Sequence, residues 1–526
     1  MNSPTGQIAF VNGRIYTADA DRSWAEAVLV DGGVISALGT SAEISEAVNG
    51  TAEVIDLEGR FVMPGIHDAH IHILLAGLKF GFECRLGQNP TASDIVAALC
   101  ECDKCKRGTL SGWIVGGEYN PNVFAPGTLD RAFLDEVYPD TPIFLYDMSI
   151  HHGFANSKAL SLAGIDAATP DPHGGRIVRR TGSSEPTGEL VERAKWKVQR
   201  AIPAPEPDMN RKAIEWAIAV INRCGITSVQ EASGTLAELR ALTELDREGQ
   251  LTLHVAAHLI WQEEGVSGVS QEDMNALIEA HARYESQHVR TGFIKIWLDG
   301  APLPPHFTQC EIDPETGQPD AMLVIGRDEL AEAVTRFDRK GMRVKIHCAA
   351  EGSVRAALDA LQEVRDANGP GMRHEIAHAL FVHADDLRRL PALNVGAEMS
   401  PAVWHIKAPE FAKLDEGCKF GTLRAAGAEV TIGSDWVLTD SPNLFPGIQG
   451  VLDRGAESVA LDEAIDMMTI AGARAVGLAD RTGSIEIGKS ADLIVLDRNL
   501  FETPITEIGA TQVLRTVFEG RTVYQA

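Results

Sequence analysis

The spacing of apolar residues differs between the ends and the middle of the chain. Near both ends, short segments alternate apolar and polar positions and are separated by Asn-Gly, Asp-Gly-Gly and Glu-Gly. Such segments and breaks are typical of β-hairpins. Because the two ends share this style, we expect residues 1–61 and 480–526 to form one β-sandwich domain.

In the middle, apolar strand-like runs alternate with helical segments, which indicates βα units and a parallel sheet. A closed barrel of eight such units is the simplest architecture that accounts for eight strand-like runs. We therefore predict an α/β fold in which residues 62–479 form a (β/α)8 TIM barrel. The eight runs are residues 61–72, 225–232, 251–261, 293–300, 343–350, 374–382, 394–401 and 428–436.

One interval between these runs is much longer than the others. Roughly 150 residues separate the first run from the second, far more than a normal connection needs. We expect residues 75–205 to form a subdomain inserted after the first barrel strand. Insertions into such barrels usually lie at the carboxyl end of the strands, over the active site.

The carboxyl ends of the predicted strands carry residues that could form one site, because the active sites of such barrels lie there. A single buried histidine is more often a packed core residue than a ligand. One candidate on each of several strands is harder to obtain by chance. The candidates are His70 and His72 on the first run, Lys295 on the fourth, His347 on the fifth, His378 on the sixth and Asp435 on the eighth.

The stretch GIHDAHIH supplies the first two candidates. Alternate side chains of a strand share a face, so His70 and His72 would point with Asp68 toward the site, and His67 would point away. Asp68 is also a candidate for orienting the two imidazoles. The alternative interpretation is a polar strand end with solvated histidines.

Composition narrows the choice of partners. The net charge of −27, from 74 acidic and 47 basic residues, would repel phosphate backbones and disfavours nucleic-acid binding. No basic tract indicates a membrane partner, no signal peptide is evident at the start, and no apolar run is long enough to span a bilayer. We expect a soluble cytoplasmic protein with a small-molecule substrate.

The chain has eight cysteines, three of them clustered at Cys100, Cys102 and Cys105. Three close thiols could bind a metal or include a redox pair. No second cluster completes a four-ligand site, which favours ordinary reduced cysteines.

An ordered set of motifs resembles the amidohydrolase superfamily, and within it the YtcJ-like branch, amidohydrolase family 3. The resemblance covers nearly the whole chain and implies a metal-dependent hydrolase of carbon–nitrogen bonds other than peptide bonds. It also suggests a homodimer. The motifs are PGIHDAHIH, HHGFANSKALSLAGI, EPTGEL, GITSVQE, FIKIWLDG, KIHCAAEGSV, RHEIAHA and IGSDW.

The resemblance implies a centre of two divalent metal ions, usually zinc. His70, His72 and Asp435 would bind one ion and His347 and His378 the other. Lys295 would bridge both as a carbamate formed with CO2. Histidine and oxygen ligands also suit manganese, iron or cobalt.

The resemblance further implies that Asp435 moves the proton during attack by a metal-bound hydroxide. It matches His151 to a histidine that could bind the substrate carbonyl, although His151 could instead be a structural residue before a helix that begins near Asn156. The aromatic residues Trp297, Trp404 and Trp436 could line the substrate pocket or simply pack in the barrel.

Two other activities remain open. The same metal centre could hydrolyse a lactone or an ester, since activated water attacks any polarised carbonyl. A metal-dependent lyase or isomerase, or a binding protein without activity, is the third class. The sequence retains all six candidate metal ligands, which argues against a binding protein that has lost its activity.

Overall fold

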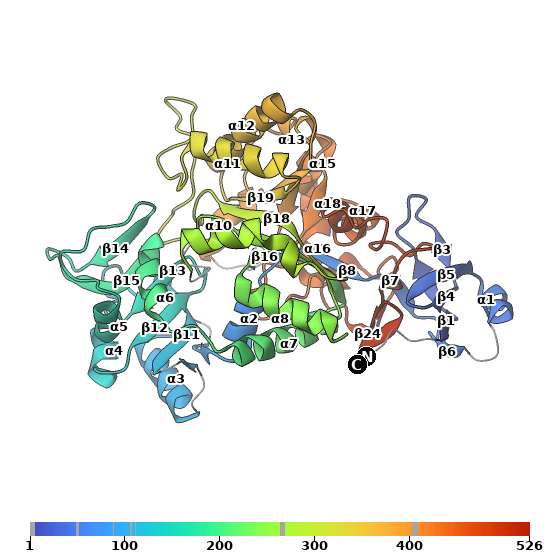
Figure 1. Cartoon of the computed structure of the whole chain (residues 1–526), viewed down its shortest axis with the longest axis horizontal. Coiled ribbons are helices and arrows are strands. Elements are labelled where there is room, and N and C mark those ends of the chain that lie inside the picture. The colour runs from blue at the N-terminus through green and yellow to red at the C-terminus, as the bar shows by residue number, and fades with distance from the viewer. Residues whose placement is uncertain are drawn as a thin grey trace.

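The computed structural model describes residues 6–48, 52–87, 89–105, 108–110, 112–263, 269–401 and 409–526. Figure 1 shows three parts in a row, with the barrel between a sheet built from residues 84–192 and two sheets built from the chain ends. Trp404 and the loop around it lie outside the described residues. Among the described helices, none combines the length and apolar character needed to cross a membrane.

An eight-stranded parallel sheet forms the barrel, in the order β22-β21-β20-β19-β18-β17-β16-β8. A parallel bridge between Ile71 and Trp436 and a 2.7 Å hydrogen bond from the Asp435 amide to the His70 carbonyl join the first strand to the end of the last. The strands are β8 (Ile66–Ile71), β16 (Ile226–Gly234), β17 (His254–Ile260), β18 (Val289–Trp297), β19 (Arg343–Cys348), β20 (His374–His378), β21 (Val395–Met399) and β22 (Val430–Ile432).

Amphipathic helices cover the outside of the barrel. In α7, for example, Pro207 begins the helix, and Ala213, Ile214, Ala217, Ile218 and Ile221 form the buried face. Except for Ala213, these side chains belong to the largest apolar core, which also contains the outward-facing residues of the barrel strands. The principal helices are α2 (Ile73–Gly81), α7 (Pro207–Arg223), α8 (Leu236–Arg247), α10 (Gln271–Glu279), α11 (Arg327–Arg339), α12 (Glu351–Asn368), α15 (Phe420–Ala425), α16 (Phe445–Leu452), α17 (Leu461–Met467) and α18 (Ile470–Ala475).

The chain ends form two further sheets, which share a small apolar core containing Phe10, Val28, Val62 and Leu493. One sheet has the order β5-β4-β1-β6 and the other the order β25-β24-β23-β7-β2-β3. The strands are β1 (Gln7–Val11), β2 (Arg14–Tyr16), β3 (Trp24–Ala25), β4 (Ala27–Asp31), β5 (Val34–Gly39), β6 (Glu53–Asp56), β7 (Phe61–Pro64), β23 (Leu493–Leu496), β24 (Val513–Phe518) and β25 (Arg521–Gln525).

The fold class is confirmed, because each of the eight predicted runs overlaps one barrel strand. The first run, residues 61–72, is two strands rather than one. Its first part, β7, pairs with β23 in a terminal sheet, and only its second part, β8, enters the barrel. The break falls at Gly65, where an added Cβ would lie 2.2 Å from the Thr227 hydroxyl, so a larger residue would not fit.

The insertion contains its own sheet, with the order β10-β11-β12-β13-β15-β14 and β9 beside β11. Short helices flank this sheet. The elements are β9 (Cys84–Arg85), α3 (Ala92–Cys105), β10 (Thr109–Leu110), β11 (Trp113–Tyr119), α4 (Ala132–Val137), β12 (Ile143–Asp147), β13 (His152–Ala155), α5 (Ser157–Leu162), β14 (Gly175–Arg179), β15 (Pro186–Glu192) and α6 (Trp196–Ala201).

The expectation that the clustered cysteines are reduced is wrong for Cys102, since a disulfide joins it to Cys84. Cys84 lies on β9, which packs beside α3 and so meets Cys102 from a distant part of the sequence. Two residues along a helix turn a side chain through about half a turn, so Cys100 faces another direction and is free. The side chain of Cys105 lies outside the described residues.

Candidate metal centre

His70 and His72 project from the end of β8, and each ring is held by a hydrogen bond on its Nδ1 side. His70 Nδ1 lies 2.6 Å from Glu398 Oε2, and His72 Nδ1 lies 2.8 Å from the Ser233 hydroxyl. The two Nε2 atoms therefore face the barrel interior. Metal-binding histidines are commonly oriented in this way by a partner on the other ring nitrogen.

Lys295 is fully buried on β18, and its Nζ lies 3.3 Å from His70 Nε2. Burial and the nearby charge of Lys345 lower the pKa of the Lys295 amine to about 7, against the opposing pull of Glu398. The amine can thus be neutral near physiological pH. A neutral amine is a nucleophile, which a reaction with CO2 to give a carbamate requires.

Asp435 lies just beyond β22, with Oδ1 3.4 Å from His72 Nε2 and 3.7 Å from His70 Nε2. Burial opposes ionisation of this carboxyl group, but a hydrogen bond from His72 and the charges of His378 and Lys295 lower its pKa to about 2. The Asp435 backbone has a φ of 49°, a left-handed conformation that side chains other than glycine rarely adopt. Such strain is common at functional sites.

His347 and His378 complete the cluster from β19 and β20. Their ring centroids lie 4.6 Å apart, and those of His378 and His70 lie 4.8 Å apart. Burial lowers the pKa of both rings, that of His378 to about 3, so they are neutral and have the lone pair that a metal ligand needs. His347 Nε2 contacts the Gly300 carbonyl at 3.1 Å, which leaves Nδ1 for the interior.

Two groups of donor atoms within the described chain are close enough to surround an ion. One comprises His70, His72 and Asp435, and the other His70, His378 and Glu398, with all donor atoms of each group within 4.8 Å of one another. Glu398 belongs to the second group because it holds His70 Nδ1. Its oxygen also accepts a 3.2 Å hydrogen bond from the His378 amide, so it ties two histidine-bearing strands together.

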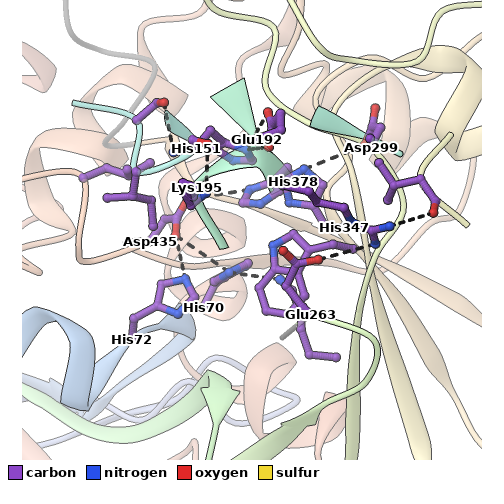
Figure 2. A pocket seen from close by; sticks show the side chains of 18 residues that line it. His70, His72, His151, Glu192, Lys195, Glu263, Asp299, His347, His378 and Asp435 are labelled. Atoms are coloured by element: carbon purple, nitrogen blue, oxygen red, sulfur yellow. Dashed lines mark hydrogen bonds and ion pairs between the residues drawn. The ribbon is translucent and has the colours of Figure 1, made fainter. Parts of the chain in front are cut away.

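His151 reaches the same cavity from the insertion (Figure 2). Its Nδ1 lies 3.0 Å from both oxygens of Glu192, and its ring centroid lies 5.7 Å from that of His347. Burial favours the neutral imidazole, but the Glu192 carboxylate outweighs this effect and raises the pKa of His151. Lys195 donates a 2.8 Å hydrogen bond to the His151 carbonyl and fixes the loop.

The cavity has two adjoining lobes that share His151, His347, His378 and Asp435. Most residues that line the first lobe, the polar lobe, are polar or charged, and they include Glu263, whose carboxyl pKa is raised to about 7 by burial. The second lobe is mostly apolar. Its walls are formed by Ala301, Pro302, Leu303, Ala349, Leu380, Leu414 and Leu438.

The two aromatic candidates within the described residues, Trp297 and Trp436, have different positions. Trp297 lines the polar lobe, with the Lys295 amine 4.9 Å from its ring centre. Trp436 does not line either lobe and is fully buried beside Phe80 and Trp216, with ring centroids 5.8 and 6.1 Å away. Of the two alternatives for Trp436, pocket lining or packing in the barrel, its position matches packing.

Several residues beside the centre were not predicted. Asp68, the expected partner of the imidazoles, instead accepts hydrogen bonds from the His70 and Ser434 amides, and Glu398 and Ser233 hold the rings. Glu398 could have been noticed as a single acid within the apolar run NVGAEMSP. Ser233, and Glu192 and Lys195 in the insertion, carry no local signal that separates them from ordinary polar residues.

Comparison with known proteins decides the family. A model of the amidohydrolase family matches residues 53–524. The chain belongs to the amidohydrolase family. This amidohydrolase is therefore an enzyme that hydrolyses carbon–nitrogen bonds other than peptide bonds.

Individual relatives of the amidohydrolase match along nearly their whole length. It is 30% identical to the N-substituted formamide deformylase of Arthrobacter pascens over 550 residues, which cover 98% of each chain. It is 25% identical to YtcJ of Bacillus subtilis over 541 residues, again 98% of each chain. A metal-dependent hydrolase from Pyrococcus furiosus shares the fold, with a TM-score of 0.70, 24% identity, and coverage of 94% of this chain and 99% of that one.

Proposed function

We propose that this amidohydrolase cleaves a small N-substituted amide, with N-substituted formamides as the first substrate class, at a centre of two divalent metal ions. The observation that carries the proposal is the convergence of His70, His72 and Asp435, with donor atoms within 4.8 Å of one another, beside the buried Lys295 amine. The similarity to an N-substituted formamide deformylase along the whole chain supports the substrate class.

The donor set fits zinc, which prefers imidazole nitrogen and carboxylate oxygen. His70, His72 and Asp435 would hold one ion, His347 and His378 the other, and Lys295 would bridge them as a carbamate. The low pKa values of the buried imidazoles leave their nitrogens free of competing protons. When bound, the ions would supply Lewis acidity that activates water and polarises the substrate carbonyl.

The protein's own residues would move the protons. Asp435 is ionised at neutral pH, so its carboxylate can accept a proton from the attacking water. It then delivers that proton to the leaving nitrogen, and the amide and water become a carboxylic acid and an amine. The Glu192 carboxylate raises the pKa of His151 and so favours its protonated form, which would donate from Nε2 to the carbonyl oxygen, where negative charge develops.

The shape of the cavity supports an apolar substituent on the substrate nitrogen. The apolar lobe begins at the shared residues His347 and Asp435 and extends between Pro302, Leu380 and Leu414. A hydrocarbon group placed there would leave water, and each buried CH2 would contribute about 0.8 kcal/mol.

The test is hydrolysis of N-hexylformamide by the zinc-loaded enzyme, followed by release of both formate and hexylamine. We expect activity that chelation removes and zinc restores. N-hexylacetamide, hexyl acetate and a lactone serve as comparisons. If protein with two ions per chain releases amine from neither amide, the proposed function is wrong, and ester or lactone turnover alone would identify the alternative activity.

Other expectations stay proposals. These are the domain boundaries at residues 61, 75, 205 and 480, a homodimer, and a cytoplasmic location. Disulfides such as Cys84–Cys102 persist mainly in oxidising compartments. Fractionation of the producing cells would therefore test the proposed cytoplasmic location.

A further inference from the structure

A second cavity, of about 290 Å³, lies where the insertion meets the barrel. Helices α2, α7 and α8 border it on the barrel side. On the insertion side it is bordered by β11, β12 and α6, which Figure 1 labels together with α2, α7 and α8. Most of its wall is apolar. The apolar lining residues include Leu74, Leu75, Leu78, Val115, Ile202, Pro203, Pro205 and Leu236.

The polar atoms in this cavity are unusual because those without a partner are all acceptors. Glu83 is only 6% exposed, and its Oε2 makes no hydrogen bond within the described part of the chain. Gln199 Oε1 and Asn210 Oδ1 also line the cavity and are likewise unpaired there. A buried polar atom without a partner costs free energy, so a ligand that brings hydrogen-bond donors to these atoms would be stabilised.

Lys79 is the cation that interacts electrostatically with Glu83, but it makes no hydrogen bond to Glu83 Oε2 within the described residues. Lys79 is itself buried and forms an ion pair of 2.7 Å with Glu118, and its amine also donates to the Val437 carbonyl. Burial raises the pKa of the Glu83 carboxyl group to about 7, and Lys79 only partly offsets this effect. A second cation in the cavity would therefore stabilise the Glu83 carboxylate.

We propose that this cavity binds a primary amine with an apolar substituent, whose ammonium group faces Glu83. An ammonium group has three N–H donors, no acceptor and a positive charge, which suits a buried carboxylate oxygen without a hydrogen bond. The apolar substituent would lie against the leucine side chains of α2. An alcohol would offer one donor and a carboxylate none, so neither matches the site.

The cavity is connected to the metal centre through one side chain. Ser233 lines the cavity, and its hydroxyl group contacts His72 Nδ1 and donates to Glu231. An amine in the cavity would therefore lie one residue from a proposed metal ligand. The binding claim rests on the cavity alone, whereas recognition of the ligand as the product of the reaction rests on the proposed function.

The test is calorimetric titration of hexylamine into the full-length protein and two glutamate variants. Glu83→Gln should weaken binding by about 10- to 100-fold, the range for hydrogen bonds to a charged group. Glu332→Gln, the same change at an exposed position on α11, should bind like the parent. Hexan-1-ol and hexanoate should bind at least tenfold more weakly than the amine. Equal affinity in Glu83→Gln and the parent would overturn the proposal.

A second variant distinguishes this cavity from the metal centre. Ala237 is an exposed lining residue at the start of α8, so Ala237→Phe fills the cavity with little risk to folding. It should abolish the titration signal, and chelation of metal from the parent should leave the signal intact. The reverse result would place the amine at the metal centre and overturn the proposal. Hexylamine binding by an enzyme that does not cleave N-hexylformamide would retain the site and reject only the proposed function.

Discussion

At the scale of single residues, the centre depends on side chains whose charge is set by burial. None of the ion pairs in the described chain involves Lys295, although the residue is completely buried. A protonated ammonium group in that position would repel metal ions. A carbamate on Lys295 would instead supply two oxygen ligands and a negative charge.

Replacing Lys295 by alanine should remove the bridging ligand. We expect Lys295→Ala to lose at least one metal ion per chain and to reduce kcat/KM by about a thousandfold or more, because catalysis by the centre depends on both ions. Elemental analysis and the formamide assay measure the two effects. Propionate should restore part of the activity, and Lys197→Ala, on the surface of α6, is the control. Full metal content in Lys295→Ala would contradict a bridging role.

His151 acts at the same scale but outside the ligand set. Because it would bind the carbonyl oxygen as charge develops, His151→Asn should lower kcat by about 100- to 1000-fold with little change in metal content. Glu192→Gln should lower kcat less, since the ring stays in place but loses the carboxylate that raises its pKa. A purely structural role predicts instead that both variants lose thermal stability while the remaining folded enzyme keeps its kcat.

At the scale of elements, side chains on neighbouring strands orient the candidate metal ligands. Glu398 on β21 contacts the ring of His70 on β8 and the amide of His378 on β20, and Ser400 donates a 3.0 Å hydrogen bond to its other oxygen. Gly433, just after β22, permits close approach to β8, since a Cβ there would lie 2.5 Å from His70 Cβ. The orientation of the ligands is thus a property of the closed strand order.

Glu398→Gln tests this cross-strand support. The amide has nearly the same volume but accepts fewer and weaker hydrogen bonds, so metal affinity should fall by about 10- to 100-fold while the barrel remains folded. Competition with a chelator measures the affinity, and circular dichroism measures the fold. Glu363→Gln, at an exposed position on α12, should change neither property. An unchanged affinity in Glu398→Gln would show that His70 needs no partner on Nδ1.

At the scale of the whole molecule, acid–histidine pairs join the barrel to the terminal sheets. His254, at the start of β17, lies 2.9 Å from Asp492, just before β23. His288, just before β18, lies 2.6 Å from Asp246 and 3.0 Å from Glu519. These contacts lie at the amino ends of barrel strands, away from the metal centre, and therefore serve stability.

The His288 contacts should make stability depend on pH. Burial opposes protonation of His288, but hydrogen bonds to Asp246 and Glu519 outweigh it and raise its pKa to about 9, above the ordinary value of 6.5. The stabilising contribution is therefore complete below pH 6.5 and is lost as pH rises through 9. Denaturant unfolding should show this loss in the parent and in the control His173→Gln. If the unfolding free energy of His288→Gln fell with pH as steeply as that of the parent, His288 would not be the source of the pH dependence.

Much of this organisation could be predicted from the sequence, because a barrel strand is visible as an apolar run, and a polar or ionisable residue near the end of the run indicates the site. Lys295 and His347 were found in this way. Glu398 was missed because hydrogen bonding between distant strands leaves no periodic signal. For Trp436 the sequence left pocket lining and barrel packing open, because the direction of a side chain beyond the end of β22 carries no periodic signal. The Cys84–Cys102 bond depended on how the insertion folds, which no local pattern encodes.

The pairing of β7 with β23 has a consequence for biosynthesis. Phe61–Pro64 leaves the ribosome early, but its antiparallel partner Leu493–Leu496 is made only near the end of translation. Until then, one edge of β7 has no partner, and unpaired strand edges invite association with other chains. Polypeptides released before Leu493 would keep that edge exposed, so we expect them to aggregate or be degraded. The strands near the end of the chain thus cover the edge of β7 only after they have been synthesised.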